Sequence, residues 1–223
     1  MFVNINKPKG PTSFDVVAKV RKVTGVKKVG HAGTLDPLAS GVLVVAVGRE
    51  YTRQISTVVE KEKEYLATVT LGVTSTTDDE EGEKRISNVE FLIPNEKTLN
   101  DSLNTFKGKI EQIPPIYSAV KVKGKEAYKY ARRGQEVKMK SREVEIKNIE
   151  ILSYDFPTLV LRVITGKGVY IRSLVRDIGE KLGTGAYMSD LVRERVGEFK
   201  IEDSIKVSDL EEHFRSLKNS RVV

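Results

Sequence analysis

Asp36 is the acidic residue whose surroundings best suit chemistry, because it lies in a glycine-bracketed loop, GHAGTLDPLASG, between a predicted helix and a predicted strand. Rigid elements on both sides of such a loop can hold a carboxylate in a fixed position toward a ligand. The sequence Asp-Pro-Leu-Ala equally suits a helix N-cap with proline at the first helical position, and this alternative stays open. His31, at the start of the same loop, is compatible with ligand contact or with an ordinary hydrogen-bonded loop histidine.

Tyr65, Tyr170 and Arg172 are three further candidates for a functional site. Each tyrosine falls in or at the end of a predicted strand, where a half-buried structural aromatic is the competing interpretation. Arg172 lies near the start of a predicted helix, one turn before Arg176, and a solvated position is equally compatible with its spacing. Spacing alone therefore does not decide whether these residues bind a ligand.

Residues 121–142 form a basic arm, in which lysines and arginines are interleaved with Tyr128 and Tyr130. Cationic side chains neutralise phosphates and tyrosine rings stack on unpaired bases, so the pattern suits RNA. A solvated charged face is the alternative, since most charge runs are of that kind. The residues expected to contact nucleic acid include Lys121, Lys129, Arg132 and Arg133.

The composition excludes several chemistries. The chain of 223 residues contains no cysteine and only two histidines, so disulfides, thiolate catalysis and cysteine zinc sites are ruled out, and neither a metal nor a cofactor is expected. A net charge of +7 is compatible with a polyanionic partner. No stretch is long and apolar enough to cross a bilayer, and the N-terminus lacks an export signal, so a cytoplasmic protein is expected.

The elements that must position the candidates are predicted from hydrophobic spacing and from capping residues. A capping box of Thr12 and Asp15 opens a helix over residues 13–24, and Gly25 ends it. The acidic loop STTDDEEG is expected to be solvated. The other predicted elements are strands near 42–47, 65–71, 144–151 (with a bulge near Asn148) and 158–164, a helix after Pro94, a short helical piece within the basic arm, a helix over 171–182 and a terminal helix that carries Leu210, Phe214 and Leu217. Strands mixed with helices indicate an α+β fold.

The order of these pieces resembles the bacterial tRNA pseudouridine-55 synthases, the TruB family. NKPKGPTSFDVV is similar to the family's opening lysine-proline motif, VGHAGTLDPLASGVLVVAVGREYTR to its catalytic block, and KEYLATVTLG to the segment with its active-site tyrosine. QIPPIYSAVKVKGKEAYKYARRG, GKGVYIRSLVRDIGEKLGTGA and LVRERVGEF continue the match. The resemblance covers residues 4 to about 199, and the 24 residues after Phe199 are too few for the family's separate C-terminal RNA-binding domain.

The resemblance implies a role for each candidate. Asp36 matches the catalytic aspartate, which serves as nucleophile or base, Tyr65 the tyrosine that stacks on the target base, and Arg172 the arginine paired with that aspartate. The positions that match the site for the flipped nucleotide are His31, Tyr170 and Leu191, and the supporting motif is Lys7 and Pro8. The implied fold is the pseudouridine synthase fold, with a mixed, mainly antiparallel sheet flanked by helices and a catalytic cleft. Residues 1–205 would form the catalytic domain, with a basic RNA-binding insertion at about 109–142, and residues 206–223 a short helical tail.

The implied activity is isomerisation of a T-loop uridine, U55, of tRNA to pseudouridine, without a cofactor, by a monomer that needs no protein partner. A noncatalytic RNA-binding module is one alternative. A two-carboxylate glycosidase is another, but no second acidic residue lies in a comparably framed loop. The guide-RNA-dependent archaeal enzymes of the same family fit less well, because PPIYSAVKVKGKEAYKYAR has the pattern of the stand-alone bacterial enzymes.

Overall fold

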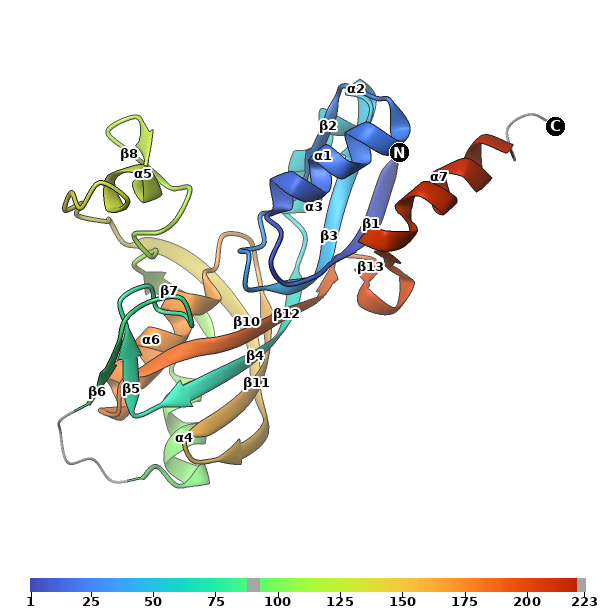
Figure 1. The fold of residues 1–223 in the computed structure, drawn as a ribbon. Helices are drawn as coiled ribbons and strands as arrows, with labels where there is room; N and C mark the ends of the chain where they lie inside the picture. The colour runs from blue at the N-terminus through green and yellow to red at the C-terminus, as the bar shows by residue number, and fades with distance from the viewer. Residues whose placement is uncertain (88–92, 220–223) are drawn as a thin grey trace. The chain divides into compact units, whose positions relative to one another are not determined.

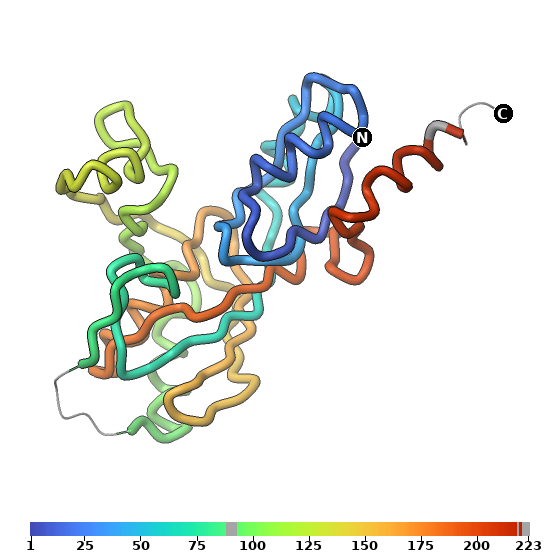
Figure 2. The backbone as a smooth tube through the Cα atoms, in the orientation of Figure 1, coloured from blue at the N-terminus to red at the C-terminus, as the bar shows by residue number. Residues whose placement is uncertain are grey.

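The computed structural model describes residues 1–87 and 93–219, and the chain divides into two compact units. Unit 1 combines both ends of the chain, Met1–Tyr65 and Leu191–Val223, whereas unit 2 is the continuous segment Leu66–Asp190. The chain passes between the units along two long strands, β4 (Lys63–Leu71) and β12 (Ala186–Val196). Figures 1 and 2 show this path, with the blue start and the red end of the chain in the same unit.

The sheet of unit 1 is built on β3 (Ser40–Val47), a run of apolar residues that is buried along almost its whole length. Strands β1 (Phe2–Lys7) and β2 (Val29–His31) pair antiparallel with β3. The second half of β12 pairs parallel with β3 through Val192–Ser40 and Arg193–Gly41. The short edge strands are β13 (Phe199–Lys200), antiparallel to β12, and β14 (Ile205–Lys206), parallel to β1.

Helix α1 (Ser13–Thr24) has the predicted bounds. Thr12 accepts from the backbone amide of Asp15 while the Asp15 carboxylate accepts from Thr12, which is the predicted capping box, and Gly25 ends the helix at a φ of 71°. The apolar face of α1 packs with residues of β1, β3 and helix α7 (Leu210–Asn219) in one cluster. The other helical segments of unit 1 are α2 (Arg49–Thr52), α3 (Ile55–Val59) and two 3₁₀ turns, Ile201–Asp203 and Val207–Asp209.

The sheet of unit 2 has the strand order β12-β4-β11-β10-β7. Strand β10 (Arg142–Asp155) pairs antiparallel with β7 (Gly108–Gln112) and with β11 (Thr158–Thr165), and its register shifts between Ile146 and Asn148, where the bulge was predicted. The helices are α4 (Glu96–Asn104), α5 (Ala127–Ala131) and α6 (Ile171–Leu182). Two hairpins complete the unit: β5 (Val73–Ser75) with β6 (Lys84–Ile86), and β8 (Lys121–Val122) with β9 (Lys125–Glu126).

The architecture confirms the predicted α+β class and the mixed, mainly antiparallel sheet. The strand pairs are antiparallel except for β1 with β14 and β12 with β3 among the pairings described above. The helices predicted after Pro94, within the basic arm and over residues 171–182 are all present. The predicted terminal helix begins at Leu210, directly after a 3₁₀ turn.

Candidate active site

Asp36 lies in the loop between β2 and β3 of unit 1, where its side chain is half-buried. The backbone carbonyl of Asp36 accepts from the amide of Ala39 at 3.1 Å, which closes a tight turn rather than a helix. The helix N-cap alternative for Asp36 is therefore wrong. Since Pro37 follows it, the aspartate sits on a turn with a preset backbone angle.

Three neighbours tie this loop to the rest of unit 1. The Ser13 hydroxyl donates to the Leu35 carbonyl and accepts from the Leu35 amide, both at 2.9 Å, immediately before Asp36. The Gly10 amide donates to the Pro37 carbonyl at 2.8 Å, immediately after it. The loop is thereby fixed on both sides of the carboxylate, as a preorganised site requires.

Lys7 supplies the third tie, although it is a cation with no exposed surface. Its Nζ donates to the carbonyls of Pro8 at 2.8 Å, Ala39 at 2.7 Å and Pro37 at 3.4 Å. Burial lowers the pKa of Lys7 from 10.5 to about 8, and the charge of Asp36 opposes that shift. Lys7 thus binds two carbonyls of the Asp36 loop, whereas Pro8 bonds to Lys7 through its carbonyl, and the supporting role of this motif stays a prediction.

His31 is the last residue of β2 and is half-buried. Its pKa is lowered by burial and, second, by the charge of Arg193. Its buried Nδ1 has no hydrogen-bond partner among the described residues. The ring of Phe14, an exposed residue of α1, meets the imidazole edge-on at 5.5 Å between centroids. His31 is thus held by an aromatic contact and not by an ordinary loop hydrogen bond to Nδ1.

Arg193 is a buried charged residue that the sequence analysis did not single out. Its Nε donates to the Val42 carbonyl at 2.7 Å and one terminal nitrogen to the Gly33 carbonyl at 3.0 Å. It also forms a side-chain hydrogen bond with Tyr65, and Asp36 acts on it through charge. One signal was available, because Arg193 lies two residues after Leu191 and so on the same strand face as a predicted site residue.

Unit 1 therefore brings together Asp36, Tyr65, Lys7 and Arg193. Tyr65 on β4 and Leu191 on β12 are both buried, at 7% exposure. A second buried lysine, Lys63, donates to the carbonyls of Val59 and Lys61, and burial lowers its pKa to about 8.

Arg172 lies in the first turn of α6 in unit 2 and is buried, so the solvated alternative is wrong. It pairs with the buried carboxylate of Asp79 at 3.2 Å and donates to the carbonyls of Tyr117 at 3.0 Å and Thr77 at 3.3 Å. The predicted pairing of Arg172 with Asp36 joins residues of the two units and stays a prediction.

Asp79 corrects the expectation that the acidic loop STTDDEEG is solvated. Its side chain is only 5% exposed and accepts from the Thr77 hydroxyl and from the Glu81 amide, in addition to Arg172. Its neighbour Asp78 has a φ of 62° and binds Arg176 of α6 at 2.9 Å. This part of the loop is held against α6 by two Arg-Asp pairs. The acidic sequence of the loop does not predict these pairs, because the arginine partners are distant along the chain.

Tyr170 is the N-cap residue of α6, two positions before Arg172, and it does not lie in a strand. Its backbone amide donates to the Gln112 side chain at 2.9 Å, and its carbonyl accepts from that side chain at 3.1 Å. The guanidinium of Arg142 lies 5.0 Å from the centre of its ring. These contacts fix the start of the helix that carries Arg172.

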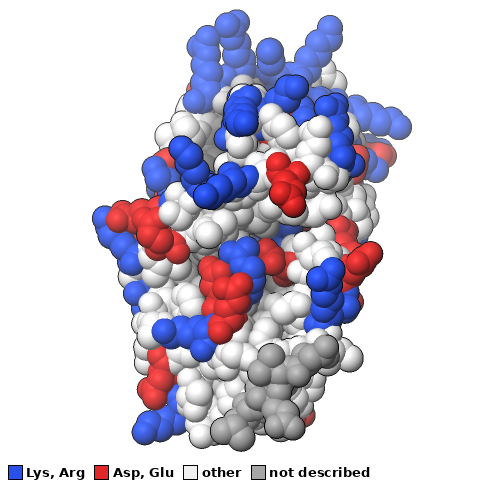
Figure 3. Space-filling model, turned by 90° about the vertical axis from the view of Figure 1, so that its left-hand side faces the viewer, with Lys and Arg blue, Asp and Glu red and all other residues white. Residues whose placement is uncertain are grey.

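The basic arm includes the β8-β9 hairpin and α5. Its lysines, Arg132 and Arg133 are exposed, whereas Arg142 is half-buried at the start of β10. Figure 3 shows lysine and arginine side chains crowded at the upper end of the viewed face. A pocket of about 240 Å³ is lined by Lys125, Lys129, Tyr130 and Arg133. The guanidinium of Arg132 lies over the Tyr128 ring at 5.4 Å. The remaining exposed members of the arm include Lys121, Lys123, Lys138 and Lys140.

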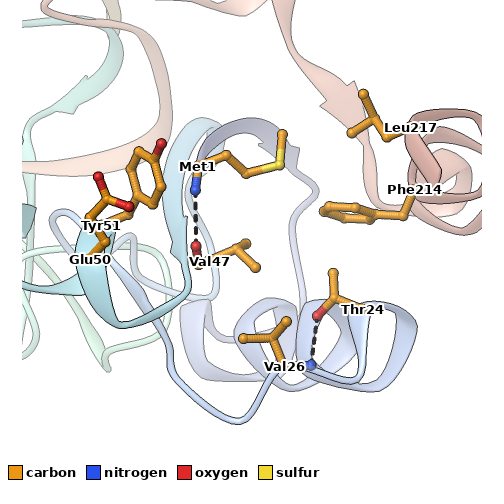
Figure 4. Close-up of a pocket in the computed structure, with 8 residues that line it drawn as sticks. All are labelled: Met1, Thr24, Val26, Val47, Glu50, Tyr51, Phe214 and Leu217. Carbon is orange, nitrogen blue, oxygen red and sulfur yellow. Dashed lines mark hydrogen bonds between the residues drawn. The ribbon is translucent and has the colours of Figure 1, made fainter. Parts of the chain in front are cut away.

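A larger pocket of about 430 Å³ in unit 1 lies elsewhere. Figure 4 shows its lining, which is mainly apolar and contains none of the candidate residues: Met1, Thr24, Val26, Val47, Glu50, Tyr51, Phe214 and Leu217. Residues 1–87 and 93–219 contain no group of three or more His, Asp or Glu side chains that could hold a metal ion. In the same residues, no helix has the length and apolar character of a membrane span.

Comparison with known proteins agrees with the resemblance noted from the motifs. The model of the TruB family pseudouridylate synthase N-terminal domain matches residues 21–171, and that of the tRNA pseudouridylate synthase B C-terminal domain matches residues 172–222. The tRNA pseudouridine synthase B of Desulfotalea psychrophila is 49% identical over 212 residues, which cover 92% of this chain and 85% of that protein. The enzyme of the same name from Clostridium tetani is 45% identical, with 94% and 72% covered.

Two solved structures share the fold over 98% of this chain. A chain of a Cbf5-Nop10-Gar1 complex superposes with a TM-score of 0.75 at 34% identity, and this chain spans 56% of its length. A chain of an H/ACA RNP bound to a substrate RNA containing 2′-deoxyuridine gives a TM-score of 0.71 at 31% identity, with 55% of its length spanned. On the two family models, the curated relatives and the fold together, this chain belongs to the TruB family of pseudouridylate synthases.

Proposed function

We propose that this protein is a tRNA pseudouridine synthase that isomerises a T-loop uridine, U55, with Asp36 as the catalytic nucleophile or base. The observation that carries the proposal is the Asp36 turn, because Ser13, Gly10 and Lys7 all bind backbone groups within three residues of this carboxylate. Such a fixed carboxylate in a chain of the TruB family is what the reaction requires.

The reaction breaks the bond between uracil N1 and ribose C1′, turns the base while it stays bound, and rejoins it through C5. No atom is gained or lost, so neither an oxidant nor a group donor enters the balance. The needs are a positioned carboxylate, a cation that favours its ionised form, and a ring that holds the base. Attack of Asp36 on C1′ and abstraction of a ribose proton by Asp36 both satisfy this balance.

The remaining roles follow the family. Tyr65 stacks on the base, Arg172 pairs with Asp36, and the positions around the flipped nucleotide are His31, Tyr170 and Leu191. Extrusion of the uridine costs less from a structured RNA loop than from a duplex, so a T-loop is a suitable target. The buried setting of Arg172 supports its role, because a guanidinium held by Asp79 and two carbonyls presents its charge in one orientation.

The basic arm is proposed as the main surface for the T-arm, since its exposed lysines and arginines surround Tyr128 and Tyr130. It is the core of the proposed RNA-binding insertion, about 109–142, in a catalytic domain of residues 1–205. We further propose a monomer that works without a protein partner in the cytoplasm, where its tRNA substrate is modified.

The test is incubation of the protein with unmodified tRNA, followed by base-specific chemical mapping of pseudouridine. We expect product at one T-loop uridine and nowhere else in the tRNA. Asp36→Asn is the control and should bind tRNA normally while turnover falls by several orders of magnitude. A wild-type protein that binds tRNA without forming pseudouridine would instead favour the noncatalytic RNA-binding module.

A further inference from the structure

Arg193 connects the two ends of the loop that carries Asp36. Gly33 and Val42, whose carbonyls accept from the guanidinium, lie on either side of the segment from Thr34 to Gly41. Lys7 and Ser13 hold the middle of that segment, and the Ala32 amide donates to the Val44 carbonyl at 2.9 Å just outside it, so Arg193 adds a side-chain tie across the two ends of the loop. An arginine suits this task because its donors are rigidly arranged and diverge from one centre.

The backbone around Arg193 leaves room only for glycine at one of these loop positions. Gly41 has a φ of 102°, and a Cβ there would lie 2.2 Å from the backbone oxygen of Arg193. Gly33 has a φ of 92°, and a Cβ there would lie 3.5 Å from the guanidinium. Gly41 therefore permits the close approach of the strand that delivers Arg193, whereas a Cβ at Gly33 would meet the guanidinium at an ordinary contact distance.

The charge of Arg193 is costly where it lies, because the side chain is 1% exposed. Burial lowers its pKa, whereas Tyr65 and Asp36 act in the opposite direction. A neutral donor could satisfy the carbonyls of Gly33 and Val42 equally well, without the cost of burying a charge. The groups that compensate a full positive charge here are the phenol and the carboxylate that the proposed reaction uses.

We propose that Arg193 is a positioning residue for the isomerisation, which fixes the Tyr65 hydroxyl and the Asp36 turn in one arrangement. The inference rests on the proposed function and adds to it a residue of unit 1 that acts through Tyr65 and Asp36 and not by contact with the base. The Tyr65 ring, held at its hydroxyl, then keeps a constant plane and position relative to the carboxylate.

The experiment is a double-mutant cycle of Arg193→Lys and Tyr65→Phe, read as single-turnover pseudouridine formation at saturating tRNA, with tRNA affinity measured separately. Each single variant should lose at least tenfold in rate while its Kd stays within threefold of wild type. The double variant should be no slower than the slower single variant, because both changes remove the same contact.

Arg195→Lys is the matched control, since Arg195 lies on the same strand but pairs with Glu62 and Glu64 at 2.6 and 3.0 Å. It should keep the wild-type rate. Multiplicative losses in the double variant, or a loss confined to Kd, would overturn the positioning role. If Arg193→Lys does not fold, as judged by circular dichroism, Tyr65→Phe decides alone, and a rate within threefold of wild type refutes the proposal. Failure of the proposed function is distinct, because the wild-type protein would then form no pseudouridine.

Discussion

Replacement of Asp79 by asparagine tests how far the proposed catalytic arginine depends on its buried partner. The change keeps the shape of the side chain and one acceptor oxygen but removes the negative charge 3.2 Å from Arg172. Both side chains are at most 6% exposed, so solvent screens this pair much less than a surface ion pair.

The magnitude follows from the geometry. Two unit charges 3.2 Å apart attract each other by about 5 kcal/mol at an effective dielectric constant near 20. Arg172 keeps the carbonyls of Thr77 and Tyr117 as acceptors, and the desolvation cost of Asp79 disappears with its charge. We therefore expect a net loss of about 2 kcal/mol in the free energy of unfolding. If the loss of Asp79 disfavours the working orientation of Arg172 by a similar free energy, the chemical step should slow roughly 10- to 100-fold.

The assay compares single-turnover rates at saturating tRNA with urea unfolding and with tRNA binding by filter retention. Glu80→Gln is the matched control in the same loop, since Glu80 is half-exposed and lies 3.8 Å from Lys84. The control should keep both rate and stability. If Asp79→Asn loses stability but keeps its rate within threefold, Asp79 supports the fold only, and the reasoning about Arg172 fails.

Three other perturbations have defined outcomes. Lys7 and Lys63 have a pKa of about 8 in the folded protein, against 10.5 in the unfolded chain. Between pH 8 and 10.5 the unfolded chain therefore binds more protons than the folded protein, so the free energy of unfolding should rise with pH in that window. Urea titrations should show a smaller rise for Lys7→Met, and an equal rise would contradict the assignment. If about four side chains of the basic arm contact phosphates, the logarithm of the tRNA affinity should fall with the logarithm of the salt concentration at a slope of roughly −3. The double variant Lys129→Glu, Arg132→Glu should show a shallower slope, while its reaction rate at saturating tRNA changes little. Excess chelator should leave activity intact once the tRNA is folded, and selective restoration by one divalent ion would refute this.

The helices and strands were predictable because their signals are local. Thr12, Asp15 and Gly25 specify both ends of α1 within the helix itself, and the structure reproduces those ends. The bulge near Asn148 was visible in the same way, as a skipped beat in the alternation of one strand. Capping, periodicity and turn residues act over a few positions, so a single sequence records them.

The buried charges were not predictable, because their partners are far away along the chain. Asp79 sits in a run of acidic residues that reads as solvated, and its partner Arg172 is on α6. Arg193 bonds to Gly33, 160 positions earlier. Composition assigns charged residues to the surface as a rule, and only tertiary contacts identify the exceptions.

The division of the chain has a consequence for the order of folding. Unit 2 is continuous, whereas the core of unit 1 combines Val16 and Val20 of α1 with Leu210 and Phe214 of α7, almost 200 residues later. Contacts of such sequence separation form late, because a long loop must close first. During synthesis unit 2, which ends at Asp190, is complete before the second half of β12 and α7 leave the ribosome. The Asp36 loop therefore lacks its hydrogen bonds to Arg193 until the last part of the chain has been made. A nascent chain thus contains the proposed catalytic aspartate long before the contacts that fix its loop can form.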